Sequence, residues 1–206
     1  MSSNKDIENH AERQSGVVTR RAFLVGAGAA AIGATWLWSF GRQPITAEAA
    51  AAGAPKMVTI IGFKDDGTRT TKESVARVVK TDDEWRKQLS PAAFEVARRA
   101  ATERPFSSDL LNVHDKGVFR CICCDNALFD STTKFESGTG WPSFYQPIAK
   151  ENILESVDMS LGMTRTEVSC RLCAAHLGHV FDDGPKPTGL RYCMNGVALR
   201  FAKAGA

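Results

Sequence analysis

Residues 170–195 read CRLCAAHLGHVFDDGPKPTGLRYCMN, and this stretch decides how the rest of the chain is interpreted. It holds three of the six cysteines and two of the four histidines of the chain. Two adjacent aspartates lie in it, and an arginine stands two positions before its last cysteine. Because such side chains rarely gather in a packing core, the stretch predicts a metal site at its start and a reactive thiol at its end.

Two pairs of cysteines have the spacing of zinc knuckles. Cys121 and Cys124 form one C-x-x-C pair, and Cys170 and Cys173 form the other. This spacing lets both sulfurs of a pair reach one ion, and four thiolates complete the tetrahedron of a structural zinc site. We therefore predict one structural Zn²⁺ per chain. Iron in place of zinc, two disulfides and four free thiols are the alternatives.

Three residues beside these pairs are ambiguous. Cys123 lies inside the first pair but lacks a ligand's spacing, and we expect it to be a small buried residue. His176 and His179 continue the three-residue rhythm of Cys170 and Cys173, so they are alternative ligands or structural histidines. Because four thiolates already fill a tetrahedron, we expect the two histidines to take part in chemistry instead.

Cys193 is the expected reactive thiol. If its segment is a strand, Arg191, Cys193 and Asn195 share one face, because side chains alternate between faces. A neighbouring cation lowers the pKa of a thiol from about 8.5, and an amide donor would help to hold the thiolate. The histidines and the two aspartates of the same stretch would hold and donate a proton.

Composition and charge narrow the class of protein. A chain of 206 residues suggests one domain with an additional segment. Its formal net charge of +3 gives no sign of nucleic-acid binding, so we expect no nucleic-acid partner, and we expect a monomer. Six cysteines in a chain of this length are too few for a disulfide scaffold.

The first 49 residues have the pattern of an export signal. Arg20 and Arg21 precede an uncharged, Ala/Gly-rich segment at 22–40, and Ala47 and Ala49 supply the small residues of a cleavage site. A twin arginine before a weakly apolar segment is typical of the bacterial twin-arginine route, which predicts a periplasmic protein. An uncleaved membrane anchor is the alternative, because the uncharged segment just reaches spanning length.

The pattern of apolar residues predicts a mainly β (α+β) domain. Residues 57–63 are expected to form a strand, and capping residues at Thr81 with Glu84 and at Ser90 with Pro91 predict two short helices. From residue 112 onward, short apolar runs alternate with turn residues, as in antiparallel sheets. We expect an export signal at 1–49, a linker and N-terminal extension at 50–80, and the functional domain at 81–206.

Four motifs resemble those of B-type peptide-methionine (R)-S-oxide reductases. They are SGTGWPSF at 137–144, HLGHVFDDGP at 176–185, PTG at 187–189 and RYCMN at 191–195. The two C-x-x-C pairs match the zinc-binding members of that family. The resemblance runs from residue 81 to residue 201, and it implies two antiparallel β-sheets that face each other, with short helices at the N-terminal side and a zinc-knuckle site.

The resemblance also implies a reaction. Cys193 would attack the sulfur of a methionine-R-sulfoxide in an oxidised protein or peptide. The oxygen must leave as water, so it needs protons, and His179, with His176 and Asp183 around it, matches the acid and its orienting groups. The products are methionine and Cys193 as a sulfenic acid, the first step of cysteine oxidation.

Other motif residues match positions that surround the nucleophile. Arg191 and Asn195 match the positions beside it. Trp141 matches the wall that holds the ε-methyl group of the substrate, although a core aromatic is the alternative for it. Phe181 is expected in the same substrate site.

One departure from the family concerns how Cys193 is regenerated. Many members carry a second cysteine where this chain has Thr139, and that cysteine closes a disulfide with the nucleophile. Because Thr139 cannot do so, the alternatives are an external thiol, Cys123 or an unusual resolving group. We expect direct recycling by a thioredoxin-like protein, since Cys123 is tied to the first cysteine pair.

The sequence leaves two other functions open. A zinc-containing β module that binds a ligand or a protein would not need Cys193. An exported thiol–disulfide oxidoreductase would work through Cys123 and Cys193, whose Cα atoms would then have to lie within about 7 Å of each other.

Overall fold

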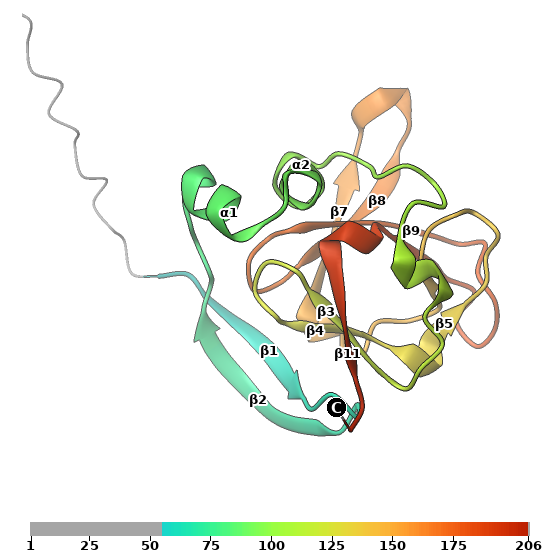
Figure 1. Cartoon of the computed structure of the whole chain (residues 1–206), viewed down its shortest axis with the longest axis horizontal. Coiled ribbons are helices and arrows are strands. Elements are labelled where there is room, and N and C mark those ends of the chain that lie inside the picture. Colours follow the sequence, from blue (N-terminus) through green and yellow to red (C-terminus); the bar gives the residue numbers. More distant parts are fainter. Residues whose placement is uncertain (1–54, 206) are drawn as a thin grey trace, which may run out of the picture. The chain divides into compact units, whose positions relative to one another are not determined.

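In the computed structural model, residues 55–205 are described, and the fold below is that of this part of the chain. It contains three antiparallel sheets and two α-helices (Figure 1). This confirms the prediction of a mainly β domain. The predicted export signal at 1–49 lies outside the described residues, and none of the helices within 55–205 has the length and apolar character to cross a bilayer.

The largest sheet has six strands in the order β5-β6-β10-β9-β8-β7. They are β5 (Lys134–Phe135), β6 (Ser143–Phe144), β7 (Ile153–Asp158), β8 (Arg165–Cys170), β9 (His176–Phe181) and β10 (Arg191–Met194). The second sheet has the order β11-β3-β4, formed by β11 (Leu199–Lys203), β3 (Gly117–Cys121) and β4 (Ala127–Asp130). The third is a hairpin of β1 (Met57–Phe63) and β2 (Arg69–Ala76).

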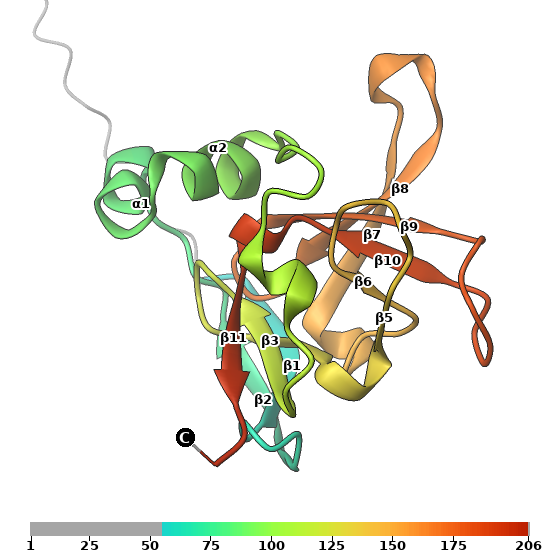
Figure 2. The same ribbon diagram turned by 45° about the vertical axis from the view of Figure 1, so that its right-hand side comes forward.

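The six-stranded and three-stranded sheets face each other (Figure 2), and buried aromatic rings fill the space between them. Phe144 of β6 stacks on Phe129 of β4 with ring centroids 4.4 Å apart. Phe119 of β3 meets Phe144 edge-on at 4.9 Å. Both arrangements suit the quadrupole of an aromatic ring. The contacts confirm the prediction of two facing antiparallel sheets.

The β1–β2 hairpin is fastened to the domain by a buried asparagine. Asn152 accepts a hydrogen bond from the backbone N–H of Ile61 at 2.7 Å and donates to the carbonyl oxygens of Ile61 and Ala127, each at 2.8 Å. Its side chain is fully buried, so all three bonds are shielded from water. The expected strand at 57–63 is therefore β1, and the N-terminal extension packs onto the domain.

Two short helices follow the hairpin. In α1 (Asp82–Gln88), the hydroxyl of Thr81 accepts from the N–H of Glu84, and the carboxylate of Glu84 accepts from the N–H of Thr81. In α2 (Pro91–Arg99), the hydroxyl of Ser90 accepts from the N–H of the third helical residue. Both caps lie where the sequence predicted them, because the partners of a cap are only three residues apart.

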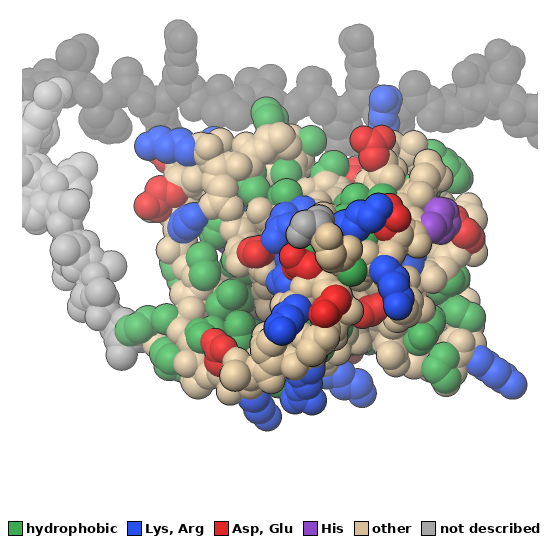
Figure 3. Space-filling model, turned by 60° about the horizontal axis from the view of Figure 1, so that its bottom comes forward, with side chains coloured by type: hydrophobic (Ala, Val, Ile, Leu, Met, Phe, Trp, Pro, Cys, Tyr) green, Lys and Arg blue, Asp and Glu red, His purple; other side chains and the backbone are tan. Residues whose placement is uncertain are grey.

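Short 3₁₀ turns connect the remaining elements. They are η1 (Asp109–Asn112), η2 (Ser131–Thr133), η3 (Lys150–Asn152), η4 (Ser160–Gly162) and η5 (Gly196–Ala198). η5 follows β10 directly and leads into β11, so it joins the two large sheets. On the face shown in Figure 3, basic and acidic side chains are interspersed over the surface.

Candidate active site and cysteine cluster

Four sulfurs form a compact group, the cysteine cluster (Cys121, Cys124, Cys170 and Cys173). Their sulfur atoms all lie within 4.8 Å of one another. The Cys121–Cys173 and Cys124–Cys170 sulfur pairs are both 3.6 Å apart. A tetrahedral site with metal–sulfur bonds of about 2.3 Å has edges of about 3.8 Å. The spacing of the sulfurs therefore fits one tetrahedral metal ion.

The two halves of the cysteine cluster are turns of the same kind. After Cys121, the N–H of Asp125 donates to the Cys121 carbonyl at 2.9 Å, and after Cys170 the N–H of Ala174 donates to the Cys170 carbonyl at 2.8 Å. Asp125 and Ala174 both have positive φ angles, 65° and 56°. Because the first turn follows β3 and the second follows β8, a metal ion held between them would join the two large sheets.

The cluster also decides between the alternatives for its neighbours. All six cysteines, which lie in the described part of the chain, are free and form neither of the two alternative disulfides. The group of possible ligands among residues 55–205 includes neither His176 nor His179. Cys123 is buried, with only 4% of its surface exposed, as expected.

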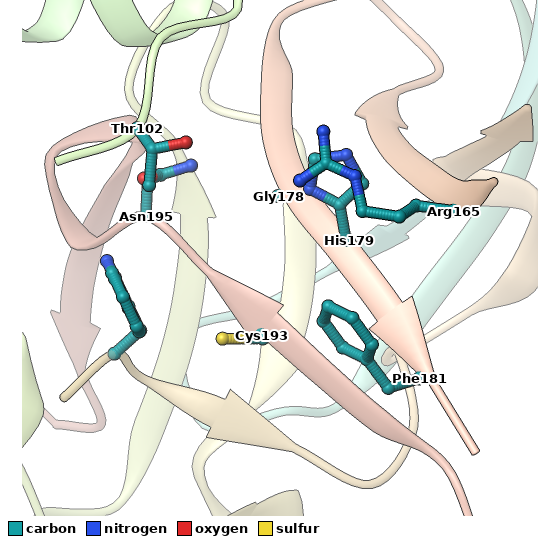
Figure 4. Close-up of a pocket in the computed structure, with 8 residues that line it drawn as sticks. Thr102, Arg165, Gly178, His179, Phe181, Cys193 and Asn195 are labelled. Atoms are coloured by element: carbon teal, nitrogen blue, oxygen red, sulfur yellow. The ribbon is translucent and has the colours of Figure 1, made fainter. Parts of the chain in front are cut away.

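Cys193 lies in a cavity of about 150 Å³ on the other side of β9, the Cys193 pocket. It is lined by Thr102, Trp141, Arg165, Gly178, His179, Phe181, Cys193 and Asn195. Figure 4 shows Cys193 on β10, His179 and Phe181 on the neighbouring strand, and Thr102 and Asn195 together at one end of the pocket. Five of the residues predicted for the catalytic and substrate-binding site thus line one cavity.

Strand register brings the reactive groups together. Cys193 of β10 pairs with His179 of β9 and with Ser143 of β6. Directly paired residues of an antiparallel sheet have Cβ atoms about 4.5–5.5 Å apart and point to the same face. Arg191 and Phe181 form the next pair on that face, and the Arg191 guanidinium lies 4.4 Å from the centroid of the Phe181 ring.

The pKa of the Cys193 thiol is shifted in the direction opposite to our expectation. Burial raises its pKa, and the hydroxyl of Thr139, at 3.9 Å from the sulfur, and the charge of Arg191 only partly offset this. Burial outweighs these lowering effects, so the predicted net lowering of the thiol pKa is wrong. Arg191 is also paired, because Asp183 accepts two hydrogen bonds from its guanidinium, both at 2.8 Å.

His179 has a partner that the sequence did not suggest. Its Nε2 lies 2.8 Å from Oδ2 of Asp158, not beside Asp183. Hydrogen bonds from Ser160 and His179 hold the pKa of Asp158 well below its usual value. An ionised carboxylate only accepts hydrogen bonds, so Nε2 of His179 carries the hydrogen and Nδ1 has the free lone pair. Burial lowers the pKa of His179, and the bond to Asp158 partly offsets this effect.

A second histidine–carboxylate pair supports the first. Nδ1 of His176 lies 2.6 Å from Oε1 of Glu167, and the His176 side chain is buried. The rings of His176 and His179 meet edge-on with centroids 5.4 Å apart. His176 does not line the Cys193 pocket, so it lies behind His179 and helps to fix its ring.

Three residues that hold the histidines of the site were missed because they lie outside the sequence motifs. Asp158, Arg165 and Glu167 lie on β7 and β8, and Arg165 binds Asp158 at 2.7 Å. Arg165 and Glu167 are two residues apart on one strand, so they face the same way. The signal that points to them is the need of a buried histidine for a carboxylate partner.

The remaining predicted residues shape the pocket. Asn195 was expected to donate to the thiolate, but its Nδ2 donates to the carbonyl of Leu177 at 3.1 Å and its Oδ1 accepts from the N–H of Glu103 at 2.9 Å. The indole N–H of Trp141 donates to the carbonyl of Glu103 at 3.2 Å. Both side chains are thus held by backbone groups at the rim of the pocket.

Comparison with known proteins identifies the family. Residues 89–203 match the SelR domain. The family is decided by this match, which covers more than half of the chain. The chain belongs to the MsrB family. Its relatives are named peptide methionine sulfoxide reductase MsrB, which is the name of an oxidoreductase.

Three relatives show how closely this MsrB family member matches. The protein of Pseudomonas syringae pv. syringae is 57% identical over 123 residues, which are 60% of this chain and 94% of the relative. That of Herminiimonas arsenicoxydans is 52% identical over 125 residues, 61% of this chain and 91% of the relative. That of Hahella chejuensis is 52% identical over 128 residues, 62% and 92% of the two chains.

Proposed function

We propose that this MsrB protein reduces methionine-R-sulfoxide in proteins or peptides to methionine, with Cys193 as the nucleophile. The observation that carries the proposal is the direct cross-strand pairing of Cys193 with His179 at a pocket lined by Trp141 and Phe181. A thiol, a proton carrier and an apolar wall are the three parts that reduction of a thioether oxide requires.

The reaction starts from a neutral pair. Burial raises the pKa of Cys193 and lowers that of His179, so the resting site holds a thiol and an uncharged imidazole. As a substrate binds, Nδ1 of His179 takes the proton from Cys193. The imidazolium that forms is stabilised by its hydrogen bond to the ionised Asp158, and the thiolate becomes the nucleophile.

The thiolate then attacks the sulfoxide sulfur. The imidazolium of His179 returns its proton to the sulfoxide oxygen, and with a second proton from water the oxygen leaves as a water molecule. A second water then attacks the Cys193 sulfur and breaks its bond to the methionine sulfur, which keeps the electron pair; the proton that this water loses neutralises the hydroxide left by the earlier proton transfer. The methionine sulfur thus gains two electrons, the Cys193 sulfur loses two, and the oxygen of the attacking water remains on Cys193 as a sulfenic acid.

Regeneration is proposed to use an external thiol donor of the thioredoxin-like class. Thr139 occupies the position beside Cys193, with its hydroxyl 3.9 Å from the sulfur. Cys123 is buried in the core and does not line the Cys193 pocket. A first external thiol would displace water from the sulfenic acid to give a mixed disulfide. A second would release Cys193 as a thiol.

The cysteine cluster is proposed to hold one structural Zn²⁺. The proposal is supported by four sulfurs at tetrahedral spacing and by the burial of three of them, with Cys124 half-buried, at the junction of two sheets. A closed site of four thiolates has no open position for a substrate. Cys121, Cys124, Cys170 and Cys173 would therefore hold the sheets together and take no part in the reaction.

We also propose that the substrates are exported proteins damaged by oxidants. The support is the twin-arginine pattern at Arg20 and Arg21, followed by an uncharged segment and small residues at a cleavage site. The route carries folded proteins, so the ion would be bound in the reducing cytoplasm before the protein meets an oxidising compartment.

The test is turnover of each epimer separately. The purified zinc-loaded protein would be offered peptides with R- or S-methionine sulfoxide, with dithiothreitol as the reductant. We expect reduction of the R epimer only, loss of it in Cys193→Ser, and its retention in the matched control Cys123→Ser. A folded wild-type protein that reduces neither epimer would refute the proposal.

A further inference from the structure

A segment outside all of the sequence motifs completes the Cys193 pocket. We call residues 101–106 the strap. α2 is followed by Ala100, whose φ of 55° is left-handed and turns the chain. The strap then carries Thr102 to the pocket, where it lies beside Asn195 (Figure 4).

Glu103 of the strap bonds to three parts of the site at once. Its backbone N–H donates to Oδ1 of Asn195 at 2.9 Å. Its carbonyl accepts from the indole N–H of Trp141 at 3.2 Å. Its two carboxylate oxygens accept from the N–H groups of Gly196 at 2.6 Å and Val197 at 2.9 Å. One residue therefore links both rim side chains to the turn that follows the nucleophile.

The Glu103 carboxylate accepts the hydrogen bonds of the first N–H groups of η5, which would otherwise have no side-chain cap. Asn195 precedes η5 but makes no side-chain cap bond to it, so Glu103 satisfies the first N–H groups of this turn. Bonds from backbone N–H groups to an ionised carboxylate are stronger than neutral ones. Gly196 makes room for the approach, because a Cβ there would lie 1.9 Å from the hydroxyl of Ser108 and 3.3 Å from Oε1 of Glu103.

The far end of the strap is fixed next to Trp141. The N–H of Phe106 donates to the carbonyl of Gly140 at 2.7 Å. A Cβ on Gly140, whose φ is 91°, would lie 2.8 Å from Cβ of Pro105. The strap is thus packed against the residue before Trp141 and bonded to the indole itself, so a shift of the strap would move the Trp141 wall.

We infer that Glu103 is a positioning residue: its carboxylate anchors the strap to η5, and the backbone of the anchored strap fixes Trp141 and Asn195 and so sets the dimensions of the substrate pocket. The inference rests on the proposed function, in which Trp141 is the wall against the substrate. Glu103 does not line the pocket itself and touches no reacting atom. Its effect must therefore appear in substrate binding more than in the reactivity of Cys193.

The test compares Glu103→Ala and Glu103→Gln with wild type, and uses Arg104→Ala as a matched control on the next, exposed residue. With an R-sulfoxide peptide, we expect Glu103→Ala to lower kcat/KM by about tenfold or more, chiefly through KM, since small misplacements at a site are costly. Glu103→Gln keeps one acceptor oxygen, so its kcat/KM should lie between those of wild type and Glu103→Ala. Alkylation of Cys193 by iodoacetamide, which does not use the wall, should proceed at the wild-type rate in all of them.

A double-mutant cycle shows whether Glu103 acts through Trp141. Trp141→Phe removes the indole N–H, and its combination with Glu103→Ala should cost little more than the larger single effect, because coupled residues are not additive. Additive losses, or a KM of Glu103→Ala equal to that of Arg104→Ala, would overturn the inference. If Glu103→Ala does not fold, Glu103→Gln decides by the same KM comparison. Failure of the wild type on both epimers would instead overturn the proposed function.

Discussion

Replacing Asp158 by alanine should slow the enzyme and move one limb of its pH profile. Asp158 accepts from His179 Nε2 at 2.8 Å and is itself held by Arg165 at 2.7 Å and by the N–H of Ser160 at 2.8 Å. Without it, the imidazole keeps its place on β9 but loses the group that fixes its tautomer and stabilises its charged form. General acid–base catalysis accelerates a reaction by about 10²- to 10⁴-fold. Because Asp158→Ala keeps His179 and removes only the carboxylate that orients it, the loss in kcat/KM should be about 10- to 100-fold.

The direction of the pH shift follows from the charges that face His179. Asp158 raises the pKa of His179, whereas burial, Arg165 and His176 lower it. Removing Asp158 leaves only the lowering effects and frees the charge of Arg165. Since His179 must be neutral to accept the thiol proton, the acidic limb of the kcat/KM profile should move to lower pH. The basic limb, which reflects Cys193, should stay in place.

The assay is peptide reduction measured across the pH range for wild type, Asp158→Ala and Asp158→Asn. Asparagine can still accept from Nε2 through its carbonyl oxygen, so Asp158→Asn should keep the tautomer and lose less activity. Asp182→Ala, an exposed carboxylate beyond the end of β9, is the matched control. An acidic limb that stays at the wild-type pH in Asp158→Ala, or an unchanged kcat/KM, would refute the role given to Asp158.

Three further predictions test the rest of the site. Asp183→Asn should leave the charge of Arg191 uncompensated and lower the pKa of Cys193, so its alkylation by iodoacetamide should reach half-maximal rate at a lower pH. Cys170→Ser should reduce bound zinc measured by elemental analysis, and with it the melting temperature, while Cys123→Ser should keep both. Thr139→Cys places a sulfur near the Cys193 thiol, 3.9 Å from the present hydroxyl, so one turnover without reductant should consume two thiols and give a disulfide, where wild type gives a sulfenic acid.

Local spacing is the part of the site that a sequence reveals. The C-x-x-C pairs identify the cysteine cluster because a four-residue turn fixes both sulfurs of a pair regardless of the rest of the fold. The alternation of Arg191 and Cys193 follows from strand geometry alone, whereas Asn195 lies just past the end of β10. Helix caps at Thr81 and Ser90 are local for the same reason. These predictions needed no knowledge of which strands pair.

Contacts between strands were not predictable in this way. The register between β8 and β9 shifts at Val168 and Ser169, and a shift of one residue exchanges the faces of a strand. The meeting of His179 with Asp158 depends on that register and on the β7–β8 hairpin. The bond between Glu103 and Gly196 spans 93 residues, so no spacing within a motif indicates it.

The pKa of Cys193 was mispredicted for a different physical reason. The sequence places a cation two residues from the thiol, but it does not show how deeply the thiol is buried or whether the cation is already paired. In the fold, Asp183 compensates Arg191, and burial has the larger effect on the thiol. A neighbour in sequence therefore gives the sign of one contribution to a pKa and not the sign of the sum.

Two arginine–carboxylate pairs flank the reactive groups of the site. Arg165 is paired with Asp158 and Arg191 with Asp183, and the charge of Arg191 only partly offsets the rise in the Cys193 pKa that burial causes. Thiols oxidise through the thiolate form, and a neutral Cys193 is therefore slow to react with oxidants that do not fill the pocket. This protection matters most where Thr139 stands in place of a second cysteine, because no neighbouring thiol would trap the sulfenic acid before further oxidation. In the proposed mechanism, proton transfer to His179 on substrate binding would restrict formation of the nucleophile to the moment when a sulfoxide is present.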